Sequence, residues 1–235
     1  GSQRKIHKKI LTNGYNSKLV VSLALRTRRF DNYVKEFSLK NNKCTIVNLG
    51  CGLDTRYIRL NDPNLDWFDL DLPEVILLKK QFFTTSENYH FISCSVLDFT
   101  WMETVKANSS GNIMFIAEGL FMYLDENKAK ELIMKLSEVF PGSELVFEIA
   151  GTYWVKKMHS PYIKWKFKHQ LGFKEDALFR FGITDHKEIE ALSGNIKFLG
   201  EWSYFDDKEK RLGWINYSGR FNSIRHVQWT LHFRL

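Results

Sequence analysis

A short glycine turn, Gly50-Cys51-Gly52, follows directly after an apolar run at residues 44–50. Glycine has no Cβ, so the backbone of such a turn can pass very close to a ligand. A buried strand, a Gly-x-Gly turn and a helix form the usual order of a nucleoside-binding loop. The third glycine of the dinucleotide motif is missing, because Thr55 follows instead. The turn alone therefore leaves open a dinucleotide, another nucleoside ligand, or an ordinary tight turn.

An acidic residue at the end of the next strand is the second feature with possible chemistry. Asp71 comes 21 residues after Gly50 (71 minus 50), near the end of the apolar run at 65–73. A carboxylate there can accept hydrogen bonds from both hydroxyls of a ribose. Asp69 shares this strand face by alternation but lies two residues further from the carboxyl edge, where ligands bind in such sheets. We predict that Asp71 binds the ribose; the alternative is that both acids only solvate the strand end.

The end of the third apolar run, 90–96, is expected to face adenine. Ser95 and the backbone amide of Val96 can offer an acceptor for the amino group and a donor for a ring nitrogen. Asp98 is the rival acceptor, three positions further on. Alternatively, Ser95 and Asp98 only cap the helix expected near Trp101.

The elements that would position these residues alternate between short apolar runs and helical periods, which is typical of an α/β fold with a parallel sheet and helices on both faces. Asp125 is predicted to cap a helix that Pro141 ends. A further helix is expected near 185–193. Strands are predicted for 44–50, 65–73, 90–96, 112–120, 144–150, 197–205 and 226–235.

The alternation stops after residue 151, and residues 152–180 are mixed aromatic and basic. This segment is longer than an ordinary connection, so we predict a lid or a substrate-shaping insertion. Its part at 156–169 and the RTRR segment at 26–29 concentrate the net charge of +7, which is 34 Lys and Arg less 27 Asp and Glu. Basic residues interleaved with aromatics can bind nucleic acid. We favour the simpler interpretation of an amphipathic helix with a solvated lysine face, so nucleic acid is not the expected partner.

Composition excludes several classes of protein. No apolar run approaches the roughly 20 residues that a membrane span needs, so a soluble protein is expected. The three cysteines, Cys44, Cys51 and Cys94, form no CxxC pair, which favours a reduced, cytoplasmic protein without disulfides or structural zinc. The seven histidines include no HExxH, and no metal site is predicted.

Four segments resemble, in the same order, the leucine carboxyl methyltransferase superfamily, and within it the bacterial branch of tetracenomycin-type polyketide O-methyltransferases. They are TIVNLGCGLDTRYIRL (45–60), WFDLDLPEVILLKK (67–80), SVLDFTWMETV (95–105) and FIAEGLFMYL (115–124). The resemblance implies a Rossmann-like class I methyltransferase fold with a mostly parallel, seven-stranded sheet. It also implies S-adenosylmethionine as cofactor and a carboxyl oxygen as the typical methyl acceptor.

The resemblance assigns three further residues. Arg26 matches the arginine that holds the methionine carboxylate of the cofactor, with Arg28 in its place if the register slips; the alternative is a surface arginine in a basic cluster. Glu118 matches a glutamate lining the cofactor pocket, and Tyr123 falls where the family approaches the reacting methyl group. With the residues argued above, the predicted cofactor-binding set is Arg26, Gly50, Cys51, Gly52, Asp71, Leu72, Ser95, Val96 and Glu118.

The chain departs from the family pattern at Ser95, where relatives usually have Asp, and in the short segment before Arg26. We expect one methyltransferase domain over 1–235, made of four parts. These are an N-terminal helical cover (1–43), the cofactor-binding core (44–150), the insertion (152–180) and the C-terminal part of the sheet (181–235).

We predict an O-methyltransferase acting on a carboxylate, or else a hydroxyl, of a small molecule. A carboxylate with a pKa of about 4 is ionised at neutral pH and needs no catalytic base, whereas a phenol with a pKa of about 10 needs one. His159, His169 and Glu148 are candidates for such a base. The alternatives are an RNA or protein methyltransferase, and a non-catalytic protein that binds S-adenosylmethionine or S-adenosylhomocysteine.

Overall fold

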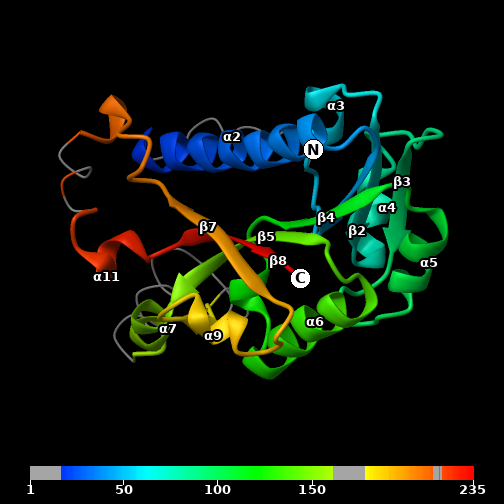
Figure 1. The fold of residues 1–235 in the computed structure, drawn as a ribbon. Helices are drawn as coiled ribbons and strands as arrows, with labels where there is room; N and C mark the ends of the chain where they lie inside the picture. The colour runs from blue at the N-terminus through cyan, green and yellow to red at the C-terminus, as the bar shows by residue number, and fades with distance from the viewer. Residues whose placement is uncertain (1–16, 161–177, 214–216, 218) are drawn as a thin grey trace.

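The computed structural model describes residues 17–160, 178–213, 217 and 219–235, and its centre is a β-sheet (Figure 1). Its strands are β1 (Cys44–Leu49), β2 (Leu65–Asp71), β3 (Tyr89–Ser93), β4 (Asn112–Ala117), β5 (Glu144–Gly151), β6 (Gly182–Ile183), β7 (Lys197–Ser203) and β8 (Trp229–Arg234). Seven of them follow one another in the order β3-β2-β1-β4-β5-β8-β7, and the two-residue β6 pairs with β5 beside this path.

The first five strands are parallel, and β8 runs antiparallel to both β5 and β7. From β1 the chain proceeds outward to β2 and β3, and then returns to place β4 on the other side of β1. The carboxyl edge between β1 and β4 is therefore the topological switch point, where open α/β sheets bind ligands. The predicted mostly parallel α/β sheet is confirmed.

Helices cover both faces of the sheet, with α2 along one face and α6 on the opposite side (Figure 1). The helices are α2 (Ser17–Lys40), α3 (Arg56–Leu60), α4 (Pro73–Lys79), α5 (Trp101–Asn108), α6 (Glu126–Val139), α7 (Thr152–Met158), α9 (Lys187–Glu190) and α11 (Asn222–Arg225), with the 3-10 turns η1 (Phe121–Tyr123) and η4 (Lys210–Leu212).

Strand β1 shows why the strands of this sheet appear in the sequence as mostly apolar runs. All six of its residues are buried. Ile46 packs in one core cluster with Phe30 and Val34 of α2. Val47 and Leu49 point to the other face, into the cluster that contains the buried residues of α5 and α6. A strand covered on both faces needs no polar alternation, because neither face meets water.

Local signals set the helix ends as expected. The Asp125 Oδ1 accepts a hydrogen bond from the Asn127 amide at 3.1 Å, which confirms the predicted cap of α6. Pro73 occupies the first turn of α4, where its missing N–H costs nothing.

Several predicted boundaries are wrong by a few residues. The strand predicted at 112–120 ends at Ala117, because Gly119 adopts a left-handed φ of 69°. The strand predicted at 226–235 begins only at Trp229. The His226 carbonyl still accepts a hydrogen bond from the Gly151 amide at 2.8 Å, but this bond lies outside the regular pairing of β5 and β8. The helix predicted at 185–193 is shorter, as α9 spans four residues.

Two predicted segments are described only in part. Helix α7 begins the predicted insertion at 152–180, but residues 161–177, with His169, lie outside the described residues. The same holds for residues 1–16 of the predicted N-terminal cover. Within the described ranges, no helix combines the length and the apolar character that crossing a bilayer requires.

Candidate functional site

The glycine turn after β1 is fixed to the end of β2. Gly50 and Gly52 adopt left-handed φ values of 66° and 50°. The amides of Gly50 and Cys51 both donate to the Leu70 carbonyl, at 2.8 and 3.1 Å. Because glycine takes this conformation at little cost, the turn can place its backbone at the switch point of the sheet.

A buried lysine, Lys79, binds the backbone carbonyls of the turn. Lys79 of α4 is 0% exposed, and its Nζ donates to the carbonyls of Gly52 and Asp54 at 3.3 and 2.9 Å. The same Nζ lies 2.8 Å from Asp69 Oδ2, so its charge is matched inside the protein. Sequence reasoning missed Lys79, which looks like any lysine at the end of an amphipathic helix.

Asp69 is an internal residue of the sheet. It is 1% exposed, and its carboxylate accepts hydrogen bonds from Trp67 Nε1 at 2.9 Å, Asn48 Nδ2 at 3.1 Å and the Tyr89 hydroxyl at 2.6 Å. With Lys79 added, these partners occupy the carboxylate. Asp69 therefore neither solvates a strand end nor faces a ligand.

Asp71 lies where β2 reaches the carboxyl edge. Its Oδ2 accepts the Gly52 amide and its Oδ1 accepts the Leu72 amide, both at 2.7 Å. A carboxylate oxygen has two lone-pair directions, so each oxygen retains one for a further donor. The structure thus brings Asp71, the glycine turn and Leu72 together, as predicted from their spacing.

A cavity of about 380 Å³ opens over the turn, within the size range of small-molecule sites. A Cβ at Gly52 would meet no atom within 4 Å, whereas one at Gly50 would lie 3.0 Å from Leu120 Cδ1. Leu53, directly after the turn, is 46% exposed, and Leu72, directly after Asp71, is 44% exposed. The lining is formed by Thr27, Asn48, Gly50, Cys51, Gly52, Leu53, Asp54, Thr55, Arg59 and Glu118.

Arg26 of α2 pairs with two glutamates, of which Glu118 lines this cavity. Its Nε lies 2.7 Å from Glu118 Oε1 and its Nη1 lies 3.0 Å from Glu148 Oε2. Burial opposes the charge, but Glu148 and Glu118 outweigh it and raise the pKa of Arg26. Burial raises the pKa of Glu148 despite Arg26, and the Tyr204 hydroxyl donates to its other oxygen at 2.7 Å.

Arg56, at the start of α3, completes this network and was missed by sequence reasoning. It is 1% exposed, and its guanidinium pairs with Asp31 at 2.7 Å, Asp54 at 2.5 Å and Glu118 at 2.6 Å. Its place within the motif that contains the glycine turn was the available signal. We call Arg26, Arg56, Glu118 and Glu148 the cofactor-side network.

Tyr123 of η1 stands beside this network. Its side chain is 39% exposed, and its ring meets Phe179 edge-on with 5.5 Å between centroids. Burial and the nearby Glu148 raise the pKa of the Tyr123 hydroxyl, so it stays protonated at neutral pH and can donate a hydrogen bond.

The residues predicted to face adenine follow directly on β3. The Cys94 amide donates to the Asp71 carbonyl at 3.0 Å, which brings the end of β3 close to Asp71. Ser95 Oγ accepts the Leu97 amide at 3.2 Å, and Val96 is buried. The Asp98 carboxylate accepts the Thr100 amide and hydroxyl, so Asp98 serves the turn before α5.

The other candidates lie apart from the network. The Arg28 side chain is 58% exposed and pairs with Asp207 at 2.9 Å. The His159 Nε2 is bound to the Phe179 carbonyl at 2.8 Å. Among the described residues, no cluster of His, Cys, Asp and Glu has the form of a metal site.

Comparison with known proteins adds the following. A model of the leucine carboxyl methyltransferase family matches residues 3–137, which is more than half of the 235 residues. The tetracenomycin polyketide synthesis O-methyltransferase TcmP of Streptomyces glaucescens is 28% identical over 185 residues, 78% of this chain and 65% of the relative. The S-adenosyl-L-methionine-dependent methyltransferase dpfgK of Gibberella zeae is 23% identical over 225 residues, 86% of this chain and 74% of the relative. The chain thus spans just under two thirds of the length of the Streptomyces relative.

Solved structures agree on the fold. The magnesium protoporphyrin IX methyltransferase of Synechocystis, solved with bound S-adenosylhomocysteine, is similar with a TM-score of 0.53 and 10% identity, over 100% of this chain and 94% of that one. The sheet order and this likeness confirm the Rossmann-like methyltransferase fold.

Proposed function

The chain belongs to the leucine carboxyl methyltransferase family, and from this premise we propose that it is an S-adenosylmethionine-dependent O-methyltransferase. The observation that carries the proposal is the left-handed glycine turn facing Asp71 at the switch point of the sheet. The proposed acceptor is a small molecule with a carboxylate, or else a hydroxyl, and the polyketide named in the Streptomyces relative supports an acceptor of that size. The free thiols of Cys44, Cys51 and Cys94 support a reducing, cytoplasmic location.

The residues around the turn fit the adenosine half of this cofactor. The space beside Gly52 gives the ligand direct access to backbone. The remaining acceptor directions of Asp71 suit two ribose hydroxyls. Exposed Leu53 and Leu72 offer apolar surface to a flat base, and Ser95 with the Val96 amide supplies the polar edge.

The cofactor-side network fits the charged half. Glu118 and Glu148 bring negative charge to a ligand that carries a sulfonium and an ammonium group, while Arg26 can pair with its carboxylate. The pairing of Arg26 with both glutamates holds these groups in place before a ligand arrives. Positioned charges of this kind cost no reorganisation when the ligand binds.

S-adenosylmethionine supplies an electrophilic methyl group, so the protein must hold an acceptor oxygen in line with it at about 3 Å. Tyr123 can donate a hydrogen bond to such an oxygen, and its raised pKa argues against a role as a base. A carboxylate acceptor needs no base, because it is already ionised at neutral pH. The chemistry of this site therefore favours a carboxylate.

Calorimetry with S-adenosylmethionine and S-adenosylhomocysteine tests the cofactor assignment. Asp71→Ala is expected to weaken binding by about 1 kcal/mol or more, or at least about fivefold, because a charge-assisted hydrogen bond is lost. Asp62→Ala is the matched control, since Asp62 precedes β2 at the opposite edge and bonds to Ser38. Unchanged affinity in Asp71→Ala would contradict the assignment.

Turnover separates the remaining candidates. Mass spectrometry of a panel of aromatic and aliphatic carboxylic acids, incubated with protein and cofactor, is expected to detect methyl esters. Cofactor binding without any ester or ether product would favour the non-catalytic binding protein. Tight, salt-dependent RNA binding would favour an RNA methyltransferase.

A further inference from the structure

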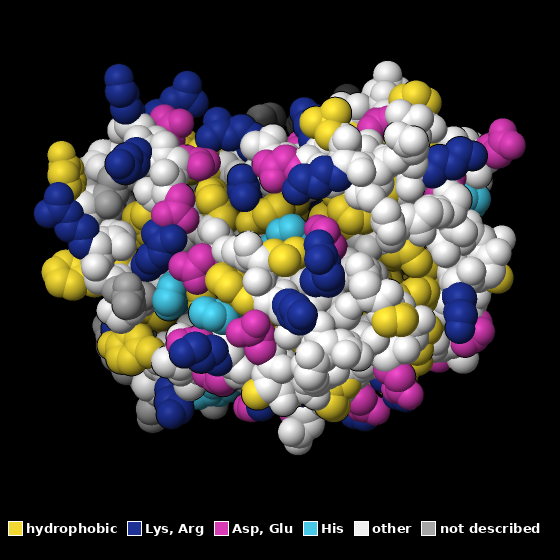
Figure 2. Space-filling view, viewed as in Figure 1, with side chains coloured by type: hydrophobic (Ala, Val, Ile, Leu, Met, Phe, Trp, Pro, Cys, Tyr) yellow, Lys and Arg dark blue, Asp and Glu magenta, His cyan; other side chains and the backbone are white. Residues whose placement is uncertain are grey.

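The segment after β7 (residues 204–213) connects a basic surface with the cofactor-side network. Lys and Arg side chains gather at the end of the molecule where η4 and α11 lie (Figure 2). Tyr204, the first residue of the segment, instead donates its hydroxyl to Glu148 Oε1 at 2.7 Å. Glu148 Oε2 lies 3.0 Å from Arg26 Nη1. Tyr204 therefore reaches Arg26 through a single carboxylate.

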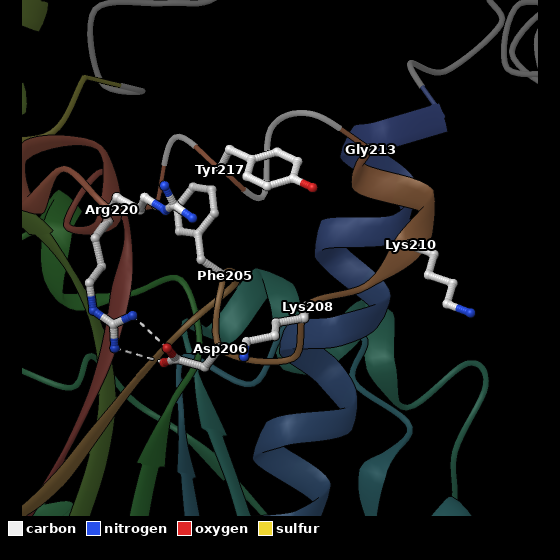
Figure 3. Close-up of a pocket in the computed structure, with 9 residues that line it drawn as sticks. Phe205, Asp206, Lys208, Lys210, Gly213, Tyr217 and Arg220 are labelled. Atoms are coloured by element: carbon white, nitrogen blue, oxygen red, sulfur yellow. Dashed lines mark hydrogen bonds and ion pairs between the residues drawn. The ribbon is translucent and has the colours of Figure 1, made fainter.

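Other contacts give this segment a fixed shape. It runs alongside α2 (Figure 3). The Asp206 carboxylate accepts two hydrogen bonds from Arg225 of α11 (Figure 3). Lys208 has a left-handed φ of 47°, a region that is disfavoured for lysine and that the surrounding structure must therefore maintain. The shape of the segment thus does not depend on the hydroxyl of Tyr204.

The Tyr204 ring is held by apolar neighbours. It packs with the small core cluster of Leu25 of α2, Trp202 of β7 and Leu212 of η4. The Trp202 ring meets it edge-on with 5.2 Å between centroids. Leu25 directly precedes Arg26, so this cluster holds the ring against the turn of α2 that carries the arginine. Phenylalanine at position 204 would keep this packing and would remove only the hydroxyl.

Glu148 depends on its two partners, because its side chain is only 1% exposed. Within the described part of the chain, Tyr204 is the one donor to Oε1 and Arg26 the one donor to Oε2. Thr230 lies opposite Glu148 on β8, but its buried hydroxyl forms no hydrogen bond with the described residues. Removing the Tyr204 hydroxyl would leave Oε1 buried without a donor, which costs the most for a charged group.

Tyr204 is a hydrogen-bond donor to Glu148 and not a base. Burial and the neighbouring Glu148 carboxylate raise the pKa of the Tyr204 hydroxyl, so it keeps its proton at neutral pH. Burial also raises the pKa of Glu148, whereas Arg26 and the Tyr204 hydrogen bond lower it. Tyr204 and Arg26 together therefore favour the charged carboxylate, which burial opposes.

Glu118 and Glu148 fix two of the three nitrogen atoms of the Arg26 guanidinium. Its Nε lies 2.7 Å from Glu118 Oε1, and its Nη1 lies 3.0 Å from Glu148 Oε2. Its Nη2 donates to no residue that the structure describes. A guanidinium is planar and rigid, so two fixed nitrogens determine the direction of the third. Glu118 lines the cavity over the glycine turn, so this third nitrogen is held beside a residue of the predicted cofactor site.

Resting on the proposed function, we propose that Tyr204 and Glu148 are positioning residues for the cofactor. The Tyr204 hydroxyl fixes the Glu148 carboxylate, and Glu148 holds Arg26 in one orientation. Arg26 Nη2 remains for the carboxylate in the methionine part of S-adenosylmethionine. Glu148 then serves Arg26 and is not the base that takes a proton from the methyl acceptor.

Two probes separate the ends of the cofactor. S-adenosylhomocysteine has the amino-acid part, 5′-methylthioadenosine lacks it, and both are titrated by calorimetry into the full chain. Tyr204→Phe is expected to weaken binding of S-adenosylhomocysteine about tenfold and to leave that of 5′-methylthioadenosine unchanged. Glu148→Gln, which keeps the shape of the side chain but removes its charge, should give the same pattern. An equal loss for both probes would mean a purely structural role and would overturn the proposal, as would unchanged affinity for both.

The double variant Tyr204→Phe/Glu148→Gln tests whether Tyr204 acts through Glu148. It should lose no more affinity for S-adenosylhomocysteine than Glu148→Gln alone, because the effects of two residues that act in series do not add. Additive losses would show that Tyr204 acts independently of Glu148, and would also overturn the proposal.

Arg28→Ala is the matched control. Arg28 joins α2 to the same segment, since it pairs with Asp207 at 2.9 Å, but its side chain is 58% exposed and lies outside the network. This variant should bind both probes as the wild type does. A loss like that of Tyr204→Phe would show that docking of the segment matters rather than the hydroxyl, which would overturn the proposal. Wild-type protein that binds neither probe would instead count against the proposed function, on which this inference rests.

Discussion

The cofactor-side network and the segment after β7, which carries Lys208 and Lys210, lie at the same edge of the sheet but differ in how their charges are matched. In the network, Arg56 is 1% exposed and meets three carboxylates at 2.5 to 2.7 Å. In the segment after β7, Lys208 and Lys210 have no carboxylate partner within ion-pair distance among the described residues. The positive charge of Arg56 is neutralised by carboxylates of the protein, whereas Lys208 and Lys210 keep an excess of positive charge.

The difference follows from desolvation. A buried charge must be matched as the chain folds, because removing it from water costs several kcal/mol. A charge at the open surface stays hydrated and needs no partner inside the protein. The network therefore ties stability to the predicted cofactor site, whereas the charges of Lys208 and Lys210 can change with little effect on folding.

Arg56→Ala gives the largest expected effect. The free energy of unfolding should fall by about 3–5 kcal/mol, because three carboxylates each lose their buried cationic partner and keep only a second one. Arg59→Ala is the matched control: Arg59 also pairs with Asp31 and Asp54, but it is 36% exposed and should contribute about 1 kcal/mol or less. Urea denaturation measures both. Equal losses of unfolding free energy in the two variants would contradict the distinction between buried and exposed charges.

Gly50→Ala should come next, at about 1–2 kcal/mol of unfolding free energy, because the φ of 66° is unfavourable for alanine. The new Cβ would also lie 3.0 Å from Leu120. Gly52→Ala has the same φ problem without a contact. If the space beside Gly52 serves the cofactor, calorimetry of Gly52→Ala should show a loss of affinity larger than its stability change explains.

A smaller effect is expected from pH at Glu148. Burial raises the pKa of this carboxyl above its ordinary 4.5, so its stability contribution is fully present below that value and is lost as pH rises through the folded-state pKa. Glu148→Gln removes this titration. Denaturation from about pH 4 to about pH 8 should therefore show the variant gaining on the wild type as pH rises. A constant difference would mean that Arg26 fully compensates the buried charge.

Lys208→Gly should have the smallest effect and the opposite sign. Glycine relieves the left-handed strain, and the expected gain is about 0.5–1 kcal/mol in unfolding free energy. Lys210→Gly, in η4, provides the comparison and should bring no gain. Thermal denaturation distinguishes the two. A loss of stability in Lys208→Gly would show that the lysine stabilises the fold.

Sequence patterns predicted the parts of the fold that depend on neighbours along the chain. The apolar runs gave the strands, Asp125 gave a helix start, and the spacing of Gly50 and Asp71 gave the turn and its acid. These features rest on burial, capping and strand length, which short stretches of sequence record.

Contacts between distant segments could not be predicted in this way. Arg56 meets Asp31 and Glu118 across 25 and 62 residues. Asp69 and Asp71 look alike in sequence, but Asp69 becomes internal through its contacts with Lys79 of α4 and Tyr89 of β3.

Lys79 has a consequence for how fast a ligand can bind. It holds the Gly52 and Asp54 carbonyls within the folded protein itself, so the turn has its final shape before any encounter. Little conformational entropy is then lost on association. Stopped-flow traces should show a single step whose rate rises linearly with ligand concentration, rather than a slow ordering phase that reaches a plateau.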